Sequence, residues 1–490
     1  MSPTYAIFRT PRWQIIFFAA LLGFLLSKGA ALIPGYGLDD YAAVLEDRPL
    51  WFYFSQGRFT QAGLQAAMSV LHLSVTAVQW PIVVTFIVGG AAALALGLTW
   101  LTQDRGSVWS QAAVAALMAA FPYLTEYFWF RESLVTQCAS FILIGAFFLS
   151  LPRRLGEGAR LRDCAFPVVL LVALAGAQQT AFLVAAFFVA GRLVLDAANS
   201  QDGIRGSIRG NWAILAIFGM AVAAYLVLYM ISRKLGGPAT DQRASLVLTS
   251  DIPVRLRQIG ALIRSVLFES EPIRSAASKW LLNALLVASV VLVAVQRKRA
   301  AVLVLTLLLV MLAGSVLLVS ISREWWPVPR AIYSIGFAFG IGLSVATALA
   351  GASRVMASLI AVAAFVASME SASILHDQGR LNRWDLAMAS ALAHDVLAAS
   401  GGQRLPLVIS TGPGYQPYSL APHTAQGDLN LSALQVPWAL QRLISESTGN
   451  EWQVTVQLSS SDCEGQARWP APDGIIILGG QKALVCLAGR

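Results

Sequence analysis

Charged residues are scarce in this sequence. Only 12% of its 490 residues are Asp, Glu, Lys or Arg, about half the usual share in soluble proteins, whereas 57% are hydrophobic. Its four Cys residues are too few for a disulfide framework, and no Cys/His cluster has zinc-site spacing. Its glycine-rich segments lack the strand and helix order of a nucleotide-binding loop. These absences exclude an ordinary soluble enzyme and a soluble sugar-nucleotide site.

Long apolar runs take the place of the missing charge. About 20 apolar residues cross the ~30 Å hydrocarbon layer as a helix. We therefore predict an α-helical polytopic membrane protein with about 11 transmembrane helices. They lie near residues 13–33, 80–101, 108–124, 133–151, 164–177, 180–195, 211–232, 279–296, 300–321, 330–350 and 354–370.

The distribution of Lys and Arg predicts the orientation. The net charge of +9 is compatible with nucleic acid, an acidic ligand or an anionic membrane surface, and the apolar runs favour the membrane. Short cytoplasmic loops hold the excess of basic residues. With the N-terminus inside, the cytoplasmic loops hold thirteen basic residues and the short outer loops five. We expect a cytoplasmic N-terminus and an outer C-terminus.

Residues 233–279 depart from this rule, because they carry eight basic residues on the outer side. One interpretation is an additional span that the pattern hides, although Pro253 and Glu269 disfavour it. The other is an amphipathic helix on the outer surface, with Arg257 and Arg264 on one face toward lipid phosphate.

The composition changes after about residue 370, which predicts two domains. Residues 1–370 form the transmembrane domain, with outer loops at 34–79 and 233–278, and residues 371–490 form a small α/β domain outside the membrane. That domain is expected to contain helices at 370–400 and 431–447, strands at 404–411 and 452–458, and a hairpin of 474–478 with 483–487. Cys463 and Cys486 would lie in an oxidising compartment, and the sequence leaves their pairing open.

The outer loops hold the candidate chemistry, and the adjacent pair Asp39 and Asp40 is the most suggestive part. A carboxylate at a partly desolvated membrane boundary has a raised pKa, which suits a general base. The alternative is a helix cap or a solvated loop.

Two further sets of side chains share the outer side. Aromatic, amide and acidic groups could stack and hydrogen-bond a sugar or acceptor, although aromatic belts are common at membrane interfaces. These are Tyr41, Trp51, Glu126, Trp129, Glu132, Gln178, Gln179, Glu324 and Trp325. Basic residues on the outer side, where the preference for cytoplasmic Lys and Arg disfavours them, could bind the phosphate of a lipid-linked donor. These are Arg58, Arg255, Arg257, Arg264, Lys279, Arg323 and Arg330.

Several motifs in order resemble the bacterial type II glucosyl transferases that modify O-antigen, a branch of the GT-C membrane glycosyltransferases. The motifs run from Gly-Tyr-Gly-Leu-Asp-Asp-Tyr at 35–41 to the terminal hairpin at 469–487. Between them come Trp51, Gly-Arg-Phe-Thr at 57–60, residues 122–133, Gln178-Gln179, Pro-Arg-Ala at 329–331 and a helix at 377–396.

This resemblance implies a GT-C-like fold, and a sugar, expected to be glucose, moved from a polyprenyl-phosphate donor to a cell-surface glycan such as O-antigen in lipopolysaccharide. The resemblance makes Asp39 or Asp40 the expected base. Gly57 and Arg58 would correspond to the Gly-Arg pair of the family. The reaction would occur at the outer face of the bacterial inner membrane, with the C-terminal domain in the periplasm. No cofactor is certain, and a divalent cation (Mg or Mn) stays open, as do a lipid-linked glycan flippase and a glycan polymerase or ligase.

Overall fold

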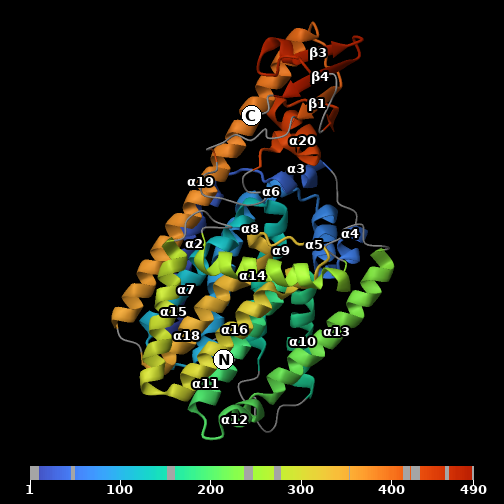
Figure 1. The fold of residues 1–490 in the computed structure, drawn as a ribbon. Helices are drawn as coiled ribbons and strands as arrows, with labels where there is room; N and C mark the ends of the chain where they lie inside the picture. Colours follow the sequence, from blue (N-terminus) through green and yellow to red (C-terminus); the bar gives the residue numbers. More distant parts are fainter. Residues whose placement is uncertain are drawn as a thin grey trace.

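The computed structural model describes residues 10–45, 50–151, 161–236, 245, 247–269, 277–351, 354–411, 420, 431–457 and 463–487. Figure 1 shows a bundle of long helices with a small α/β domain beyond one end. The predicted fold class, a helical polytopic membrane protein with a small C-terminal α/β domain, is confirmed.

The first half of the bundle alternates long spans with short helices at the end nearest the α/β domain (Figure 1). Its helices are α2 (Pro11–Lys28), η1 (Gly29–Leu32), α3 (Leu38–Leu45), α4 (Leu50–Ser55), α5 (Phe59–Val70), α6 (Val75–Thr102), α7 (Val108–Ala120), η2 (Pro122–Leu124), α8 (Thr125–Trp129), α9 (Arg131–Ser150), α10 (Leu161–Ala177) and α11 (Gln179–Asn199).

The second half adds the remaining spans. Its helices are α12 (Gly203–Gly210), α13 (Trp212–Gly236), η4 (Thr249–Asp251), α14 (Ile252–Phe268), α15 (Ala277–Gln296), α16 (Lys298–Ile321), α17 (Pro329–Ile332), α18 (Ser334–Ala350) and α19 (Arg354–Ala399).

Every predicted span coincides with a helix, but the number eleven is not confirmed. Within the described ranges, nine helices are long and apolar enough to cross a membrane. A tenth is possible because α7 and the η2–α8 segment form a pair bent by 41°. The bend follows Phe121, where Pro122 cannot donate a backbone hydrogen bond. The apolar helix Cys164–Ala177 is shorter than a full span.

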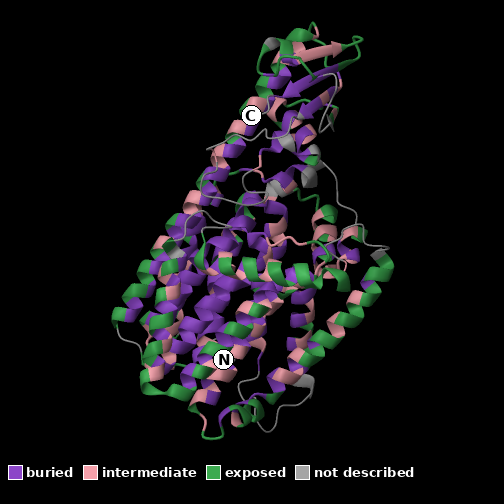
Figure 2. Cartoon of the chain, in the orientation of Figure 1, coloured by how far each residue is buried: buried purple, intermediate pink, exposed green. Residues whose placement is uncertain are grey.

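Burial differs strongly between the spans. The α17–α18 span is 94% buried inside the protein, whereas the α13 span is 17% buried and lies at the edge of the bundle (Figure 2). Close packing around α18 needs a glycine, because a Cβ on Gly340 would lie 2.2 Å from Cγ of Met118. Exposed side chains along the middle of α13, such as Leu226 and Met230, are apolar, as lipid contact requires, and the exposed Arg233 and Lys234 lie in its last turn.

A buried lysine joins three helices in the bundle. Lys28, at the end of α2, is fully buried. Its Nζ donates to the carbonyl oxygens of Ala120 and Phe121 at 3.0 and 3.1 Å and to Ser371 Oγ at 3.0 Å. These carbonyls lie at the C-terminal end of α7, where helix carbonyls lack intrahelical donors and a positive charge is favourable. Lys28 therefore caps α7 at its bend and ties it to α19.

The basic segment after α13 forms η4 and α14, and α14 runs across the bundle instead of along it (Figure 1). Its exposed side chains are both apolar and basic, and include Ile252, Leu256, Arg257 and Arg264. In the described part of this segment no additional spanning helix is present. The geometry agrees with the interpretation of α14 as a surface helix.

The C-terminal domain has a four-stranded sheet of order β2-β1-β4-β3. Its elements are β1 (Leu407–Thr411), η6 (Ala433–Gln435), α20 (Pro437–Thr448), β2 (Val454–Gln457), η8 (Pro472–Gly474), β3 (Ile475–Leu478) and β4 (Lys482–Leu487). β1 pairs in parallel with β2 and β4, and β3 with β4 forms the predicted antiparallel hairpin. The single helix α19 runs through the expected domain boundary, so the two parts share one continuous helix.

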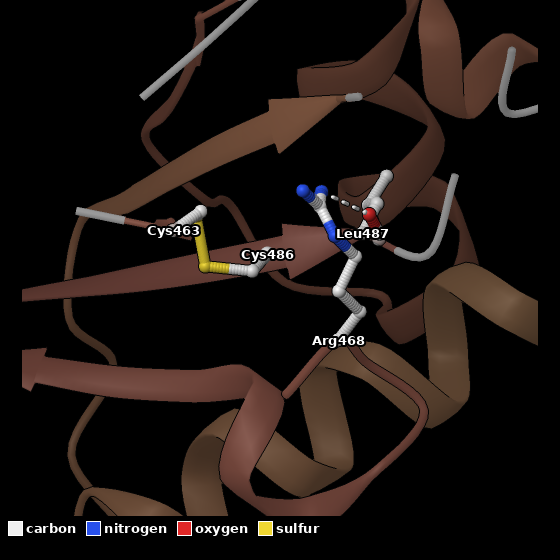
Figure 3. Close-up of a disulfide and its surroundings, with 4 residues drawn as sticks. All are labelled: Cys463, Arg468, Cys486 and Leu487. Atoms are coloured by element: carbon white, nitrogen blue, oxygen red, sulfur yellow. Dashed lines mark hydrogen bonds between the residues drawn. A yellow bond between two sulfur atoms is a disulfide. The ribbon is translucent and has the colours of Figure 1, made fainter. Parts of the chain in front are cut away.

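Cys463 and Cys486 form a disulfide, which resolves the pairing that the sequence leaves open (Figure 3). It attaches the segment before β3 to β4 in the sheet. Next to it, Arg468 Nη1 donates to the carbonyl oxygen of Leu487 at 3.1 Å. The backbone N–H of Trp469 donates to the carbonyl oxygen of Cys486 at 2.7 Å. These links hold the loop before β3 against the end of β4.

We expect Lys28→Met to destabilise the protein by about 1–3 kcal/mol, because two buried carbonyls lose a charged donor. The thermal midpoint of the purified protein in detergent checks this. Phe18→Leu, an apolar change at an exposed position of the same helix, is the control. An unchanged midpoint in Lys28→Met would show that the cap contributes nothing to stability.

Candidate active site

Asp39 and Asp40 are consecutive residues of α3, at the end of the bundle that faces the α/β domain (Figure 1). Consecutive helical residues point about 100° apart, so the two carboxylates cannot share one environment. The Asp40 carboxylate is completely buried, whereas the Asp39 side chain is 27% exposed. The helix therefore divides the pair into an inner and an outer carboxylate.

The inner carboxylate connects two helix starts. Asp40 Oδ2 accepts from the N–H of Gly37 at 2.8 Å and of Arg131 at 3.1 Å, and Oδ1 accepts from the N–H of Glu132 at 2.9 Å. Gly37 directly precedes α3, and Arg131 and Glu132 open α9. The first N–H groups of a helix have no intrahelical acceptor and carry partial positive charge. Asp40 therefore fixes α3 on the start of α9.

Burial raises the pKa of Asp40 to about 7, while the three N–H donors and the Arg131 charge act in the opposite direction. The Arg131 guanidinium is itself buried, and its Nη2 donates to the carbonyl oxygen of Ala31 at 2.7 Å. The end of the first span is thereby attached to α9 as well. Asp40 thus lies in a rigid, dry region.

The outer carboxylate faces an arginine from a distant part of the chain. Arg330 Nη2 lies 3.8 Å from Asp39 Oδ2. The same guanidinium forms an ion pair with the buried Glu126, whose Oε2 accepts from the Arg330 backbone N–H at 2.6 Å. Its central carbon lies 4.4 Å from the ring centroid of Phe130 and 4.5 Å from that of Trp326. Asp39, Glu126 and Arg330 form what we call the carboxylate–arginine cluster.

Further predicted residues support this cluster through tyrosines. Tyr127 donates to the Arg330 carbonyl oxygen at 2.9 Å, and Gln178 Nε2 donates to the Tyr127 hydroxyl at 2.6 Å. Arg58 interacts electrostatically with Tyr127. Tyr53 donates to Glu132 Oε1 at 2.7 Å. The structure therefore brings α4, α8, the start of α11 and α17 to one end of the bundle.

The Gly57-Arg58 pair forms the turn between α4 and α5. Gly57 has φ +71°, in the left-handed region that glycine tolerates, and a Cβ there would lie 2.1 Å from the Tyr229 ring. Close by, Gln179 Nε2 donates to the Tyr225 hydroxyl at 3.0 Å. This turn thus presses against α13 and places Arg58 near the cluster.

Two predicted sugar-binding aromatics are buried instead of presenting a face. Tyr41 accepts a hydrogen bond from Asn382 Nδ2 at 2.8 Å, and Trp129 packs on Gly35 and Gly37. Both line a cavity of about 10 Å³ between α3 and α19, which has room for about one water molecule. In this structure they hold α3 and its surroundings in place. Trp51 on α4, in contrast, is exposed.

The remaining predicted basic residues gather around α14. Arg255 lies over the Trp325 ring at 4.9 Å and donates to the Arg323 carbonyl oxygen at 2.9 Å. Lys279 Nζ donates to the carbonyl oxygens of Ser265 and Glu269 at 3.2 and 2.8 Å. Arg264 pairs with Glu269 at 2.8 Å.

Arg257, also on α14, is exposed, and Arg323 and Glu324 follow α16. The α14 group therefore stabilises the loop after α16, while Arg330 and Arg58 serve the carboxylate–arginine cluster. Of the seven predicted phosphate-binding residues, only these two contact or approach the cluster in the contacts described above.

Sequence reasoning did not select Phe130, Trp326, Tyr53 or Asn382 as site residues. Phe130 and Trp326 enclose Arg330, Tyr53 holds Glu132, and Asn382 holds Tyr41. Trp326 neighbours the selected Trp325, so position alone could have found it. Asn382 lies far along the chain on α19, and nothing in its local pattern marks it.

Among the described residues, no group of three or more His, Cys, Asp and Glu side chains is arranged to hold a metal. Arg330 lies between the carboxylates of Asp39 and Glu126 and supplies the positive charge that they face. The role of a divalent cation stays a prediction that this geometry does not test.

Comparison with known proteins identifies the family. The model of the GtrII glucosyl transferases matches residues 31–345, more than half of the chain. The chain belongs to this family. The match extends from the end of the first span to α18 and includes α3, Glu126 and Arg330, so the carboxylate–arginine cluster lies within the family region. No curated protein matches.

Solved structures with partial similarity are those of an oligosaccharyltransferase from Archaeoglobus fulgidus. One, tethered to an acceptor peptide, is 13% identical with a TM-score of 0.40, covering 82% of this chain and 62% of that one. Another, in complex with an inhibitory peptide and a dolichol-phosphate, is 13% identical with a TM-score of 0.38, covering 84% and 64%. This chain therefore spans less than two thirds of their length.

The two aspartates are expected to respond differently to the same substitution. Asp40→Asn replaces one acceptor oxygen by an N–H donor facing backbone N–H groups, which should cost about 1–3 kcal/mol of stability. Asp39→Asn changes a partly exposed side chain and should cost less than about 0.5 kcal/mol. Thermal midpoints of the two purified variants measure this, and equal midpoints would contradict the assigned difference.

Stability should also depend on pH through Asp40. Its folded pKa of about 7 exceeds the ordinary value of 3.8, so between these values the folded state binds more protons than the unfolded state. The Asp40 contribution to stability is therefore present at acidic pH and is lost as the pH rises toward 7. From pH 5 to pH 7.5 the thermal midpoint should fall further in the wild type than in Asp40→Asn. An equal fall in both proteins would show that Asp40 does not make stability depend on pH.

Proposed function

We propose that this protein is a membrane glycosyltransferase that transfers a sugar, expected to be glucose, from a polyprenyl-phosphate donor to a cell-surface glycan. Membership in the GtrII glucosyl transferase family supports sugar transfer. The observation that carries the site assignment is the pairing of the partly exposed Asp39 with Arg330 at 3.8 Å. In a displacement reaction, a carboxylate can take the proton of the attacking hydroxyl while a neighbouring cation stabilises the leaving phosphate.

In the proposed reaction, Asp39 is the general base. Its carboxylate takes the proton of an acceptor hydroxyl as that oxygen attacks C1 of the donor sugar. The bond from C1 to the phosphate oxygen breaks, and polyprenyl phosphate leaves. One displacement inverts the configuration at C1. Asp40 does not take part, because its oxygens are occupied by the N–H of Gly37, just before α3, and by two N–H groups at the start of α9; it is a positioning residue.

Arg330 is the proposed partner of the leaving phosphate. At 3.8 Å its contact with Asp39 is looser than that with Glu126, so a phosphate oxygen can replace Asp39 while Glu126 holds the guanidinium. The rings of Phe130 and Trp326 keep its orientation. Stabilising charge that develops on a leaving group in a dry site is a large catalytic contribution. Arg58 adds positive charge nearby.

The proposed orientation places this site at the outer face of a bacterial inner membrane. The loops at the opposite end of the bundle hold most of the basic residues, as cytoplasmic loops do. The C-terminal domain, with its disulfide, would then lie in the oxidising periplasm. The exposed face of α14 would rest on the outer leaflet, where the donor is delivered.

A flippase and a glycan polymerase are the alternatives. A flippase would give substrate flux in proteoliposomes with no new covalent product. A polymerase would extend its product by many units, whereas a transferase adds one sugar per event, so mass analysis of the product separates them.

Asp39→Asn should reduce transfer from a polyprenyl-phosphate sugar by about 10²–10⁴-fold, the usual contribution of a general base. Arg330→Gln should also lower the rate, through loss of phosphate stabilisation. Product formation measured by mass spectrometry on folded protein checks both.

The matched control is Asp251→Asn, an exposed carboxylate of η4 outside the cluster, which should transfer at the wild-type rate. A folded Asp39→Asn variant with full activity would sink the base assignment. A comparison of midpoints separates loss of chemistry from loss of folding.

A further inference from the structure

A second polar site is lined in part by Gly206, Ser207 and Gly210 of α12. Figure 1 shows this helix at the end of the bundle opposite the α/β domain. The site is a pocket of about 380 Å³, within the range of about 300–1,000 Å³ typical of small-molecule sites. We call it the α12 pocket. Its lining includes Trp100, Gln103, Arg105, Arg192, Asp196 and Ser200. The pocket lies within the region that matches the family, and the proposed reaction does not use it.

The α12 pocket carries an excess of positive charge. Among the lining residues that the structure describes, Asp196 is the one acidic residue, and two arginines share it: Arg105 Nη1 lies 2.9 Å from Oδ1 and Arg192 Nε 2.7 Å from Oδ2. Asn211 Nδ2 also donates to Asp196 Oδ2, at 3.2 Å. Both carboxylate oxygens are therefore occupied, and the described lining residues carry two positive charges, from Arg105 and Arg192, against one negative charge.

Arg105 is the arginine placed for a ligand. Arg192 is nearly buried and donates to the carbonyl oxygens of Trp100 and Leu101. The Arg105 side chain lines the pocket, is 36% exposed and gives Nη1 to Asp196. A guanidinium has five N–H donors, more than this one contact uses. A guanidinium fork of this kind matches the oxygens of a phosphate.

The loop that carries Arg105 is held in place. Gln103 and Asp104 have φ of 43° and 65°, a conformation that residues other than glycine rarely adopt. Arg12, from α2, stabilises it by donating to the carbonyl oxygens of Arg105 at 2.9 Å and Gly106 at 3.2 Å. A second residue therefore orders the backbone that presents Arg105, as a preformed binding site requires.

The size of the α12 pocket exceeds that of a single phosphate. A water molecule occupies about 30 Å³ in the liquid, so about 380 Å³ accepts a phosphate together with a further polar group. Amide and hydroxyl side chains, Gln103 and Ser200, are available in the lining for that group. Trp100 adds an aromatic residue to the same lining.

We propose that the α12 pocket binds a phosphate-bearing polar group through Arg105. The same chemistry belongs to a soluble phosphoester and to the head group of an anionic phospholipid in the leaflet at this end of the bundle. The site is separate from the carboxylate–arginine cluster, and its failure would leave the proposed function unaffected.

Gly210 provides a direct way to close the α12 pocket. It lines the pocket, and a Cβ there would meet no atom within 4 Å. Gly210→Leu should therefore fill the space without a clash at its Cβ. Arg105→Gln removes the proposed phosphate contact but also a partner of Asp196. Arg205→Gln, an exposed residue of α12 outside the lining, removes the same charge and is the matched control.

The test uses the full-length protein and two probes. Glycerol phosphate is titrated in detergent, and phosphatidylglycerol is compared with phosphatidylcholine in nanodiscs, with the thermal midpoint as the readout. We expect a rise in the midpoint, with binding about ten- to a hundred-fold weaker in Arg105→Gln and lost in Gly210→Leu, but kept in Arg205→Gln.

The two probes identify the source of the phosphate. A rise with glycerol phosphate supports a soluble ligand, and a rise with phosphatidylglycerol alone supports a lipid head group. The absence of a rise with either probe would overturn the proposal. A rise that persists unchanged in both Gly210→Leu and Arg105→Gln would also overturn it, because binding would then lie elsewhere.

Discussion

The interaction on which the rest of this site depends is the buried Asp40 carboxylate between two helix starts. It accepts from one N–H before α3 and from two at the beginning of α9. Burying a charge is costly unless it is hydrogen-bonded, and here the donors are groups that the helices leave unsatisfied. This arrangement orients α3, and because Asp39 directly precedes Asp40 on that helix, it also decides where the outer carboxylate points.

The same principle recurs along this end of the bundle. Glu126 holds both the backbone N–H and the guanidinium of Arg330, and Lys28 caps the carbonyls that end α7. Each buried charge satisfies the open end of a helix that stops within the protein. The helix breaks that interrupt the spans thereby become positions for polar groups, and the proposed active site is built where several of them meet.

The sequence allowed the fold class, the positions of the nine spanning helices found among the described residues and the terminal hairpin to be predicted, because long apolar runs and period-two patterns are local signals. It also placed Asp39, Glu126 and Arg330 on one side of the membrane. It could not separate Asp39 from Asp40, whose roles differ through a 100° rotation and contacts with residues 91 and 92 positions away. Nor could it find Asn382, whose partner Tyr41 lies 341 positions earlier.

The sequence by itself therefore determined that this protein lies in a membrane and that its polar residues collect at one end of the helix bundle. Both follow from composition and from the order of apolar and polar segments along the chain. The tertiary structure decided which of those residues meet. It divided the predicted phosphate-binding residues into Arg330 and Arg58, at the carboxylate–arginine cluster, and a group around α14. The physical reason is that a charge in a membrane protein is placed by the nearest open helix end or opposite charge, and these come from distant parts of the chain.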